Sequence, residues 1–222
     1  FDGIEAMFLV RPPALANEVF LTTPSINAAA EYGVKRIVFL SIQGVEKNHF
    51  VPHYKIEQLI LKTGVEFTFL RCGFFMQNLS TTHATDIKYR NEIPLPVGKA
   101  KTAFIDVRDI AAVATIALTE KRHANQIYTL TGTEALSYNE VAEILSQALN
   151  RTIRYTNPMI PTFIFQQLRQ GQKLGFTLVV TALYTITRFG NAKTITDDVS
   201  RILGRKPISF SQFARDYREI WM

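Results

Sequence analysis

The feature that most constrains the fold is a set of three short, continuously apolar segments separated by two amphipathic ones. The apolar segments are residues 4–10, 37–41 and 65–70. Between them, 18–32 and 53–62 carry apolar side chains at helical spacing, and Gly33 and Gly64 follow as stop signals. Continuous rather than alternating apolarity is typical of strands covered on both faces of a parallel sheet. The first 72 residues therefore predict strand–helix–strand–helix–strand, an α/β fold with a doubly wound parallel sheet.

The pattern changes after residue 73. We expect a helix or lid over 74–90, an extended segment at 93–96, strands at 102–107, 126–130 and 154–156, and helices at 109–118 and over most of 161–203. Capping boxes at Ser137–Glu140 and Ser209–Gln212 each predict the start of a helix. In the last helix the predicted inner face consists of Phe213, Tyr217, Ile220 and Trp221.

Composition excludes several classes of protein. The 222 residues are 47% hydrophobic and 20% charged, which is ordinary for a globular domain. The single cysteine, Cys72, excludes an internal disulfide and a cysteine-based metal site, and the four histidines lack ligand-like spacing, so no metal is expected. No signal peptide is evident, and the longest apolar stretch, 176–189, contains four threonines and Arg188. A cytoplasmic protein with no membrane partner is expected.

The charge is unevenly distributed along the chain. Residues 1–150 carry 14 Lys/Arg and 15 Asp/Glu, a net of −1, whereas 151–222 carry 11 and 4, a net of +7, which together give +6. The basic residues of the second part are scattered and form no stripe along a helix, so we interpret most of them as solvated surface. Nucleic acid is therefore not an expected partner, although a few of these residues suit a phosphate-bearing ligand.

Six phrases occur in one order along the chain: FDGIEAMFLVRPP, INAAAEYGVKRIVFLS, HYKIEQLILKTGVEFTFLRCGFFMQNL, FIDVRDIAAVA, YTLTGTEALSYNEVAEIL and GRKPISFSQFARDY. Together they resemble the NmrA-like group of atypical short-chain dehydrogenase/reductases, which have a Rossmann fold and bind NAD(P). The resemblance implies that 1–131 is the remainder of a Rossmann domain. It implies that an excursion at 80–101 joins a mainly helical, substrate-covering part at 132–222.

The resemblance also implies a preceding segment. Members of the group open with a strand, a G-x-x-G-x-x-G turn and a helix, and this chain contains no such turn. It begins with Phe1, and its first strand resembles the fourth of the family. We therefore expect about two βα units, ~60–70 residues, to precede it. They would supply the pyrophosphate-binding turn and the loop that selects NADP or NAD, with NADPH favoured.

Ligands of a doubly wound sheet lie beyond the carboxyl ends of its strands. The first end is Arg11-Pro12-Pro13, which the resemblance places near the adenosine half of the cofactor, where Arg11 could meet a phosphate. A solvated arginine before a proline stop is the alternative. The second end is Ser41, expected to hydrogen-bond ribose or substrate, or else to form a turn.

The third end is Arg71-Cys72-Gly73-Phe74-Phe75, followed by Asn78. The family often has proline where Cys72 stands, and a buried thiol there is more simply inert packing than a redox group. Gly73 would let the backbone approach the nicotinamide, and Phe74 would supply an apolar wall beside it. Phe75 and Asn78 are predicted to contact substrate, with helix capping as the alternative for Asn78.

His53 is the predicted catalytic residue. Typical short-chain dehydrogenases use Tyr-x-x-x-Lys, whereas NmrA-like proteins have roughly Lys-x-x-x-Glu, some with His for Lys; here the frame gives His53 and Glu57. The resemblance implies that His53 donates to a ribose hydroxyl or acts as an acid near neutral pH. Glu57 is most simply an orienting or capping residue. His49, not Tyr, stands four residues earlier, which argues against carbonyl reduction by a Tyr–Lys pair. A plain helix-start residue is the alternative for His53.

Three functions from different classes follow. The first is an NAD(P)H-dependent reductase of small apolar acceptors of the quinone or azo type, which need little proton help from the enzyme. The second is a non-catalytic NAD(P) redox sensor that acts through a protein partner. The third is a complete chain without a dinucleotide, an interaction module whose strand at 4–10 would be an exposed edge. The segment 161–189 suits a lid, a core helix pair or a homodimer surface, and the sequence leaves these open.

Overall fold

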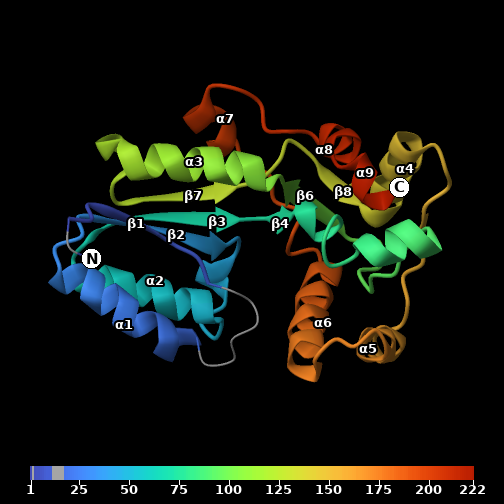
Figure 1. The fold of residues 1–222 in the computed structure, drawn as a ribbon, viewed down its shortest axis with the longest axis horizontal. Coiled ribbons are helices and arrows are strands. Elements are labelled where there is room, and N and C mark those ends of the chain that lie inside the picture. Colours follow the sequence, from blue (N-terminus) through green and yellow to red (C-terminus); the bar gives the residue numbers. More distant parts are fainter. Residues whose placement is uncertain (2, 12–17) are drawn as a thin grey trace. The chain divides into compact units, whose positions relative to one another are not determined.

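The computed structural model describes residues 1, 3–11 and 18–222 (Figure 1). Its strands are β1 (Ala6–Leu9), β2 (Arg36–Ile42), β3 (Glu66–Cys72), β4 (Phe74–Phe75), β5 (Glu92–Ile93), β6 (Lys101–Ile105), β7 (Gln126–Leu130), β8 (Ala135–Ser137) and β9 (Arg154–Tyr155). Its α-helices are α1 (Glu18–Glu31), α2 (Pro52–Thr63), α3 (Val107–Thr119), α4 (Tyr138–Leu149), α5 (Ile160–Arg169), α6 (Leu174–Arg188), α7 (Asp198–Leu203), α8 (Phe210–Asp216) and α9 (Arg218–Trp221).

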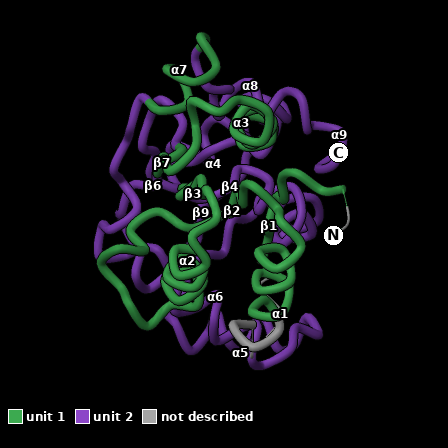
Figure 2. The backbone as a smooth tube through the Cα atoms, turned by 90° about the vertical axis from the view of Figure 1, so that its left-hand side faces the viewer, with its two compact units in different colours: residues 1–73, 108–130, 198–205 green, residues 74–107, 131–197, 206–222 purple. Residues whose placement is uncertain are grey.

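The chain divides into two compact units (Figure 2). Unit 1 contains residues 1–73, 108–130 and 198–205, and unit 2 contains 74–107, 131–197 and 206–222. The excursion expected at 80–101 lies inside the first segment of unit 2. Residues 198–205 belong to unit 1 because Asp198 accepts a hydrogen bond from the Thr129 amide at 2.7 Å and Arg205 pairs with buried Asp109 at 2.7 Å.

Unit 1 is built on a parallel four-stranded sheet in the order β1-β2-β3-β7. Phe39 pairs with Leu9 on one side and Phe69 on the other. Helices α1 and α2 cover one face of the sheet and α3 the other (Figure 1). This arrangement confirms the predicted doubly wound parallel sheet.

The core of unit 1 explains why these segments fold as they do. Ile37, Phe39 and Phe69 of the sheet and Ile56 and Ile60 of α2 have no exposed surface, and they pack in one cluster. Burial of each such side chain contributes about 1.5–3 kcal/mol. The continuous apolarity of β2 and β3 thus reflects contact with helices on both faces.

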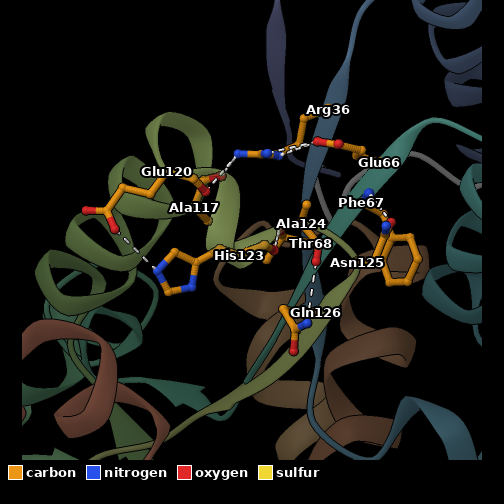
Figure 3. Close-up of polar contacts among 10 residues, drawn as sticks. All are labelled: Arg36, Glu66, Phe67, Thr68, Ala117, Glu120, His123, Ala124, Asn125 and Gln126. Atoms are coloured by element: carbon orange, nitrogen blue, oxygen red, sulfur yellow. Dashed lines mark hydrogen bonds and ion pairs between the residues drawn. The ribbon is translucent and has the colours of Figure 1, made fainter.

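The amino-terminal edge of this sheet is closed by polar contacts (Figure 3). The buried Arg36 donates to the carbonyls of Ala117 and Glu120, at 3.1 and 2.9 Å, and pairs with Glu66 at 2.8 Å. Its guanidinium therefore satisfies free carbonyls at the C-terminus of α3, where a cation is favoured. Thr68 also donates to the His123 carbonyl at 2.7 Å. These contacts are structural.

Unit 2 contains a three-stranded sheet, β4-β6-β8, and the pair β5-β9. Its core gathers large buried side chains from α4, α5, α8 and α9, among them Tyr138, Phe163, Phe210, Phe213 and Trp221. The Trp221 indole donates to the Leu79 carbonyl at 2.9 Å. The Ser137–Glu140 capping box is present at the start of α4, as predicted.

Several local expectations for unit 2 are wrong. The helix alternative for 74–90 is wrong, because the segment forms β4, a 3-10 turn at Met76–Asn78 and a π-helical turn at Asp86–Arg90; the lid alternative stays a prediction. The last helix is interrupted at Tyr217, and Ile220 is 40% exposed rather than on the inner face. Ser209 accepts from the Gln212 amide, but the Gln212 side chain turns to Asp216, so the second box is only half formed.

The described residues can be searched for a membrane-spanning helix and for a metal site. In the described ranges, no helix combines the length and the apolarity needed to cross a membrane. Within the same ranges, no group of three or more His, Cys, Asp or Glu side chains could hold a metal ion.

Candidate functional site

The carboxyl edge of the unit 1 sheet brings several predicted residues together. Ser41 lies beside Arg71 in the parallel register of β2 and β3, and Cys72 pairs with Ile42 and Leu130. Arg11 follows β1 by two residues. Alternation along β2 and β3 places Ser41 and Arg71 on the same face as Phe39 and Phe69. The apolar core therefore gives way to polar groups at this edge.

Glu57 of α2 is the centre of a buried polar cluster at this edge. The Ser41 hydroxyl donates to its Oε1 at 2.6 Å. Arg71 donates to the same oxygen through Nε at 3.1 Å and to Oε2 through Nη2 at 2.7 Å, which is a bidentate contact. Arg71 also pairs with Glu46 at 3.1 Å. The Ser41 hydroxyl therefore donates its hydrogen bond to Glu57. Toward a ribose or substrate, the Ser41 oxygen can only accept.

The sequence places Arg71 at the third strand end but assigns it no role, and the structure makes it the partner of Glu57. Burial alone would lower the pKa of its guanidinium, but the hydrogen bonds and charge of Glu57, together with Glu46, outweigh burial and raise that pKa. The carboxylate of Glu57 is almost fully buried and is neutralised by this cation. A glutamate on the inner face of one helix and an arginine at the end of the buried strand that follows it were the available signal.

His53 lies one turn before Glu57 on the same face of α2, since residues four apart are neighbours on a helix. Its ring is 6.0 Å from that of Phe39. Desolvation, aided by the positive charge of Arg11, lowers the pKa of His53 to about 4. The imidazole is therefore neutral at physiological pH, which disfavours the role of an acid near neutral pH. Neither ring nitrogen has a hydrogen-bond partner within the described part of the chain.

The first strand end is only partly described. Arg11 is half-buried, and desolvation lowers the pKa of its guanidinium. Its charge acts on His53, so the two side chains share one environment. Pro12 and Pro13 lie outside the described residues. The expected contact of all three with the cofactor stays a prediction.

At the third strand end, the backbone and the thiol are already engaged. Cys72 is 4% exposed, its Sγ donates to the Leu70 carbonyl at 3.5 Å, and burial raises the pKa of the thiol strongly. A protonated, enclosed thiol is unreactive, which favours inert packing. The Gly73 amide donates to the Leu130 carbonyl at 2.9 Å. Its approach to a nicotinamide stays a prediction.

The remaining predicted residues belong to unit 2. Phe74 and Phe75 form β4 and pair with Phe104 and Ile105 of β6, and both are half-buried. The Phe74 ring stacks against Tyr184 at 6.2 Å. Asn78 is half-buried in a 3-10 turn, and its side chain has no partner among the residues that the structure describes. Contact of these residues with cofactor or substrate stays a prediction.

The geometry of the unit 1 edge suits binding rather than proton transfer. Tyr54, the tyrosine next to His53, stacks on His49 at 4.2 Å between ring centroids. Glu57 is fully engaged by Ser41 and Arg71. The groups left for a ligand are the neutral imidazole of His53 and the oxygen of Ser41, with the charge of Arg11 beside them. Such a set can hold hydroxyl groups and an anion.

The comparisons with known proteins agree with this fold. A family profile described as the NmrA-like family matches residues 1–220. An NAD(P)H azoreductase of Xenophilus azovorans is 33% identical, over 96% of this chain and 75% of its own length. A festuclavine dehydrogenase of Aspergillus fumigatus is 32% identical, over 100% of this chain and 77% of its own.

Solved structures show the same fold at lower identity. The triphenylmethane reductase of Citrobacter, complexed with NADP(H), superposes with a TM-score of 0.87 at 20% identity, covering 97% of this chain and 78% of that one. The NADPH-dependent quinone oxidoreductase of Escherichia coli, complexed with NADPH, also gives 0.87 at 20% identity, covering 97% and 77%.

Proposed function

The chain belongs to the NmrA-like family, and from that membership we propose that it is an NAD(P)H-dependent reductase of small apolar acceptors, of the quinone or azo type. The 33% identity to an NAD(P)H azoreductase supports the reaction class. The fold shared with an NADPH-bound quinone oxidoreductase agrees with it. NADPH is the favoured donor, and a cytoplasmic location belongs to the same proposal.

The observation that carries the proposal is the position of His53 at the carboxyl edge of the parallel sheet, on α2 one turn before Glu57, whose carboxylate is engaged by Ser41 and Arg71. This is the edge at which doubly wound sheets bind dinucleotides. A bound NAD(P)H supplies the hydride. His53 donates a hydrogen bond to a ribose hydroxyl, and Arg11 attracts a phosphate.

Glu57 acts here as a positioning residue. Its two oxygens are occupied by Ser41 and Arg71, so it exchanges no proton with a ligand. The ion pair instead fixes α2 against β3, and with it the position of His53. Quinones and azo compounds match a site without a tyrosine acid, because reduction gives anions that solvent water can protonate.

His53→Leu tests the role of His53 in the protein expressed from its complete gene. We expect the KM for NADPH to rise about tenfold, the loss of roughly one hydrogen bond to a neutral group, with kcat for a benzoquinone little changed. His49→Leu is the matched control and leaves both constants unchanged. Because the pKa of His53 is about 4, kcat/KM should show no inflection near pH 6.5. An inflection there that His53→Leu removes would contradict the neutral role, and no oxidation of NADPH or NADH by any quinone or azo dye would overturn the function.

A non-catalytic redox sensor is the second candidate. The observation that favours it is that the tyrosine beside His53 is engaged in stacking with His49 rather than free to act as an acid. Calorimetric titration with NADP+ separates the two functions. Tight binding of the oxidised cofactor, together with the absence of turnover, would establish the sensor, whereas turnover would exclude it. Whether the protein is a monomer or a homodimer is tested below by its mass in solution.

A further inference from the structure

Helix α6 of unit 2 has its polar face inside and its apolar face outside. The buried residues are Thr177, Thr181, Tyr184 and Thr187. From 174 to 187 every exposed residue is apolar, and Phe189 continues the set: Leu174, Gly175, Leu178, Val179, Ala182, Leu183, Ile186 and Phe189. We refer to these eight as the α6 face. Helices of globular proteins normally show the opposite arrangement.

The orientation of α6 is fixed by contacts within unit 2. The Tyr184 hydroxyl lies 2.6 Å from Nε2 of the buried His83, and its ring packs edge-on against Phe163 at 5.9 Å. The hydroxyls of Thr181 and Thr187 donate to carbonyls one turn earlier, at 2.7 and 2.9 Å. Their polar groups are thereby satisfied inside the helix, so the threonine methyl groups can pack inward. The outward face is a consequence of this anchoring.

The α6 face is large for a surface that meets only water. Its six large side chains are exposed by 43–78%. At roughly 200 Å² per large apolar residue, they present on the order of 600 Å². This is at the upper limit of ~300–600 Å² for the largest apolar patch of a typical monomer. The preceding helix α5 adds Phe165, which is 64% exposed, and Leu168. An apolar patch at this end of the range is often functional.

The surrounding charge identifies the kind of partner. Residues 144–196 contain no Asp or Glu and six Lys or Arg. Of these, Arg169 and Lys173 flank the start of α6, and Arg188 and Lys193 flank its end; all four are exposed. A second copy of this chain would bring these cations against one another. An anionic surface attracts them, at about 1 kcal/mol per residue near a lipid headgroup layer.

We propose that the α6 face docks on an anionic lipid surface, with α6 lying in the plane of the headgroups and its apolar side chains reaching the acyl boundary. An apolar face with basic residues at its margins is typical of helices that lie on a membrane, and the absence of a spanning helix in the described ranges is compatible with docking. This proposal departs from the expectation of no membrane partner, and the vesicle experiment below decides between the two. Docking would also give the proposed reductase access to lipid-dissolved quinones, a consequence that rests on the proposed function, whereas the docking itself does not.

Vesicle sedimentation tests the docking with the protein expressed from its complete gene. We expect it to bind vesicles of phosphatidylglycerol and phosphatidylcholine at 50 mM salt, and at least tenfold more weakly to pure phosphatidylcholine or at 500 mM salt. Leu178→Ser/Leu183→Ser should lower binding more than tenfold, and Lys173→Gln/Lys193→Gln about tenfold. Phe50→Ser, at a 91% exposed position of unit 1, is the matched control and should bind as the wild type does.

Several outcomes would overturn the docking. One is the absence of binding to anionic vesicles at low salt, and another is binding that Leu178→Ser/Leu183→Ser does not weaken. A dimer by light scattering that this variant converts to a monomer would assign the α6 face to a second copy instead. A raised KM for a water-soluble quinone in this variant, with vesicle binding unchanged, would assign it to the substrate site. Vesicle binding is measured without turnover, so its failure is distinct from failure of the reductase function.

Discussion

At the residue scale, the most informative group is the buried ion pair of Glu57 and Arg71. Removing two opposite charges from water costs several kcal/mol per ion, and only good geometry with further hydrogen bonds compensates. Here the bidentate contact of Arg71 provides the geometry, and Ser41 provides a further hydrogen bond. Removing one partner leaves the other charge buried without compensation. Replacing one residue of the pair should therefore destabilise the protein more than replacing both together.

Glu57→Gln should therefore destabilise the protein by about 3–5 kcal/mol, because Arg71 keeps its charge and loses its buried carboxylate. Glu46→Gln is the matched control, because Glu46 is the other partner of Arg71 and its own side chain is 46% exposed. This substitution should lower the free energy of unfolding by less than about 1 kcal/mol. Urea unfolding followed by circular dichroism gives both values. Equal losses in the two variants would show that burial does not decide the strength of this pair.

At the scale of elements, the sequence predicted what depends on local pattern. Continuous apolar runs identified β1, β2 and β3, and Gly64, at a φ of 73°, ends α2 as expected. The brief strand β4 was missed because it exists only by pairing with Phe104 and Ile105, about thirty residues later. Ser41 could be predicted because ligands of such sheets lie beyond the carboxyl ends of the strands. His53 could be predicted because it stands where the family pattern Lys-x-x-x-Glu has its first residue. The Glu57–Arg71 contact joins a helix to the next strand, fourteen residues along the chain. Each residue could be noted separately, but their pairing has no local pattern.

Gly132 shows how closely two segments of unit 2 approach. Its amide donates to the Phe104 carbonyl at 2.7 Å, and a Cβ added to it would stand 2.5 Å from that same oxygen. The backbone must therefore move in Gly132→Ala, and we expect the free energy of unfolding, measured by urea unfolding, to fall by about 1–3 kcal/mol. Gly175→Ala is the control, since its Cβ would meet nothing within 4 Å in the first turn of α6. It should be neutral or gain up to ~1 kcal/mol. Similar values for both variants would contradict the close approach.

At the scale of the whole molecule, the two units share one chain that passes between them repeatedly, at 73–74, 107–108, 130–131, 197–198 and 205–206. The single tryptophan of the sequence, Trp221, is fully buried in unit 2. Its fluorescence therefore reports the unfolding of unit 2, whereas circular dichroism reports helices and strands of both. Coincidence of the two signals is the test for one cooperative transition.

Stability in unit 2 should depend on pH through His83. The side chain is 1% exposed, and burial lowers its pKa from 6.5 to about 4. Between these values the unfolded chain binds a proton that the folded chain does not, so stability rises with pH across this window and falls as pH decreases. From pH 7.5 to 5, the wild type should lose about 2 kcal/mol more than His83→Gln, which does not titrate. Urea unfolding monitored by Trp221 measures the difference, and the exposed control His49→Gln should keep the wild-type slope. Parallel slopes for wild type and His83→Gln would mean that His83 is protonated in the folded protein at pH 5, and that its contact with Tyr184 tolerates the charge.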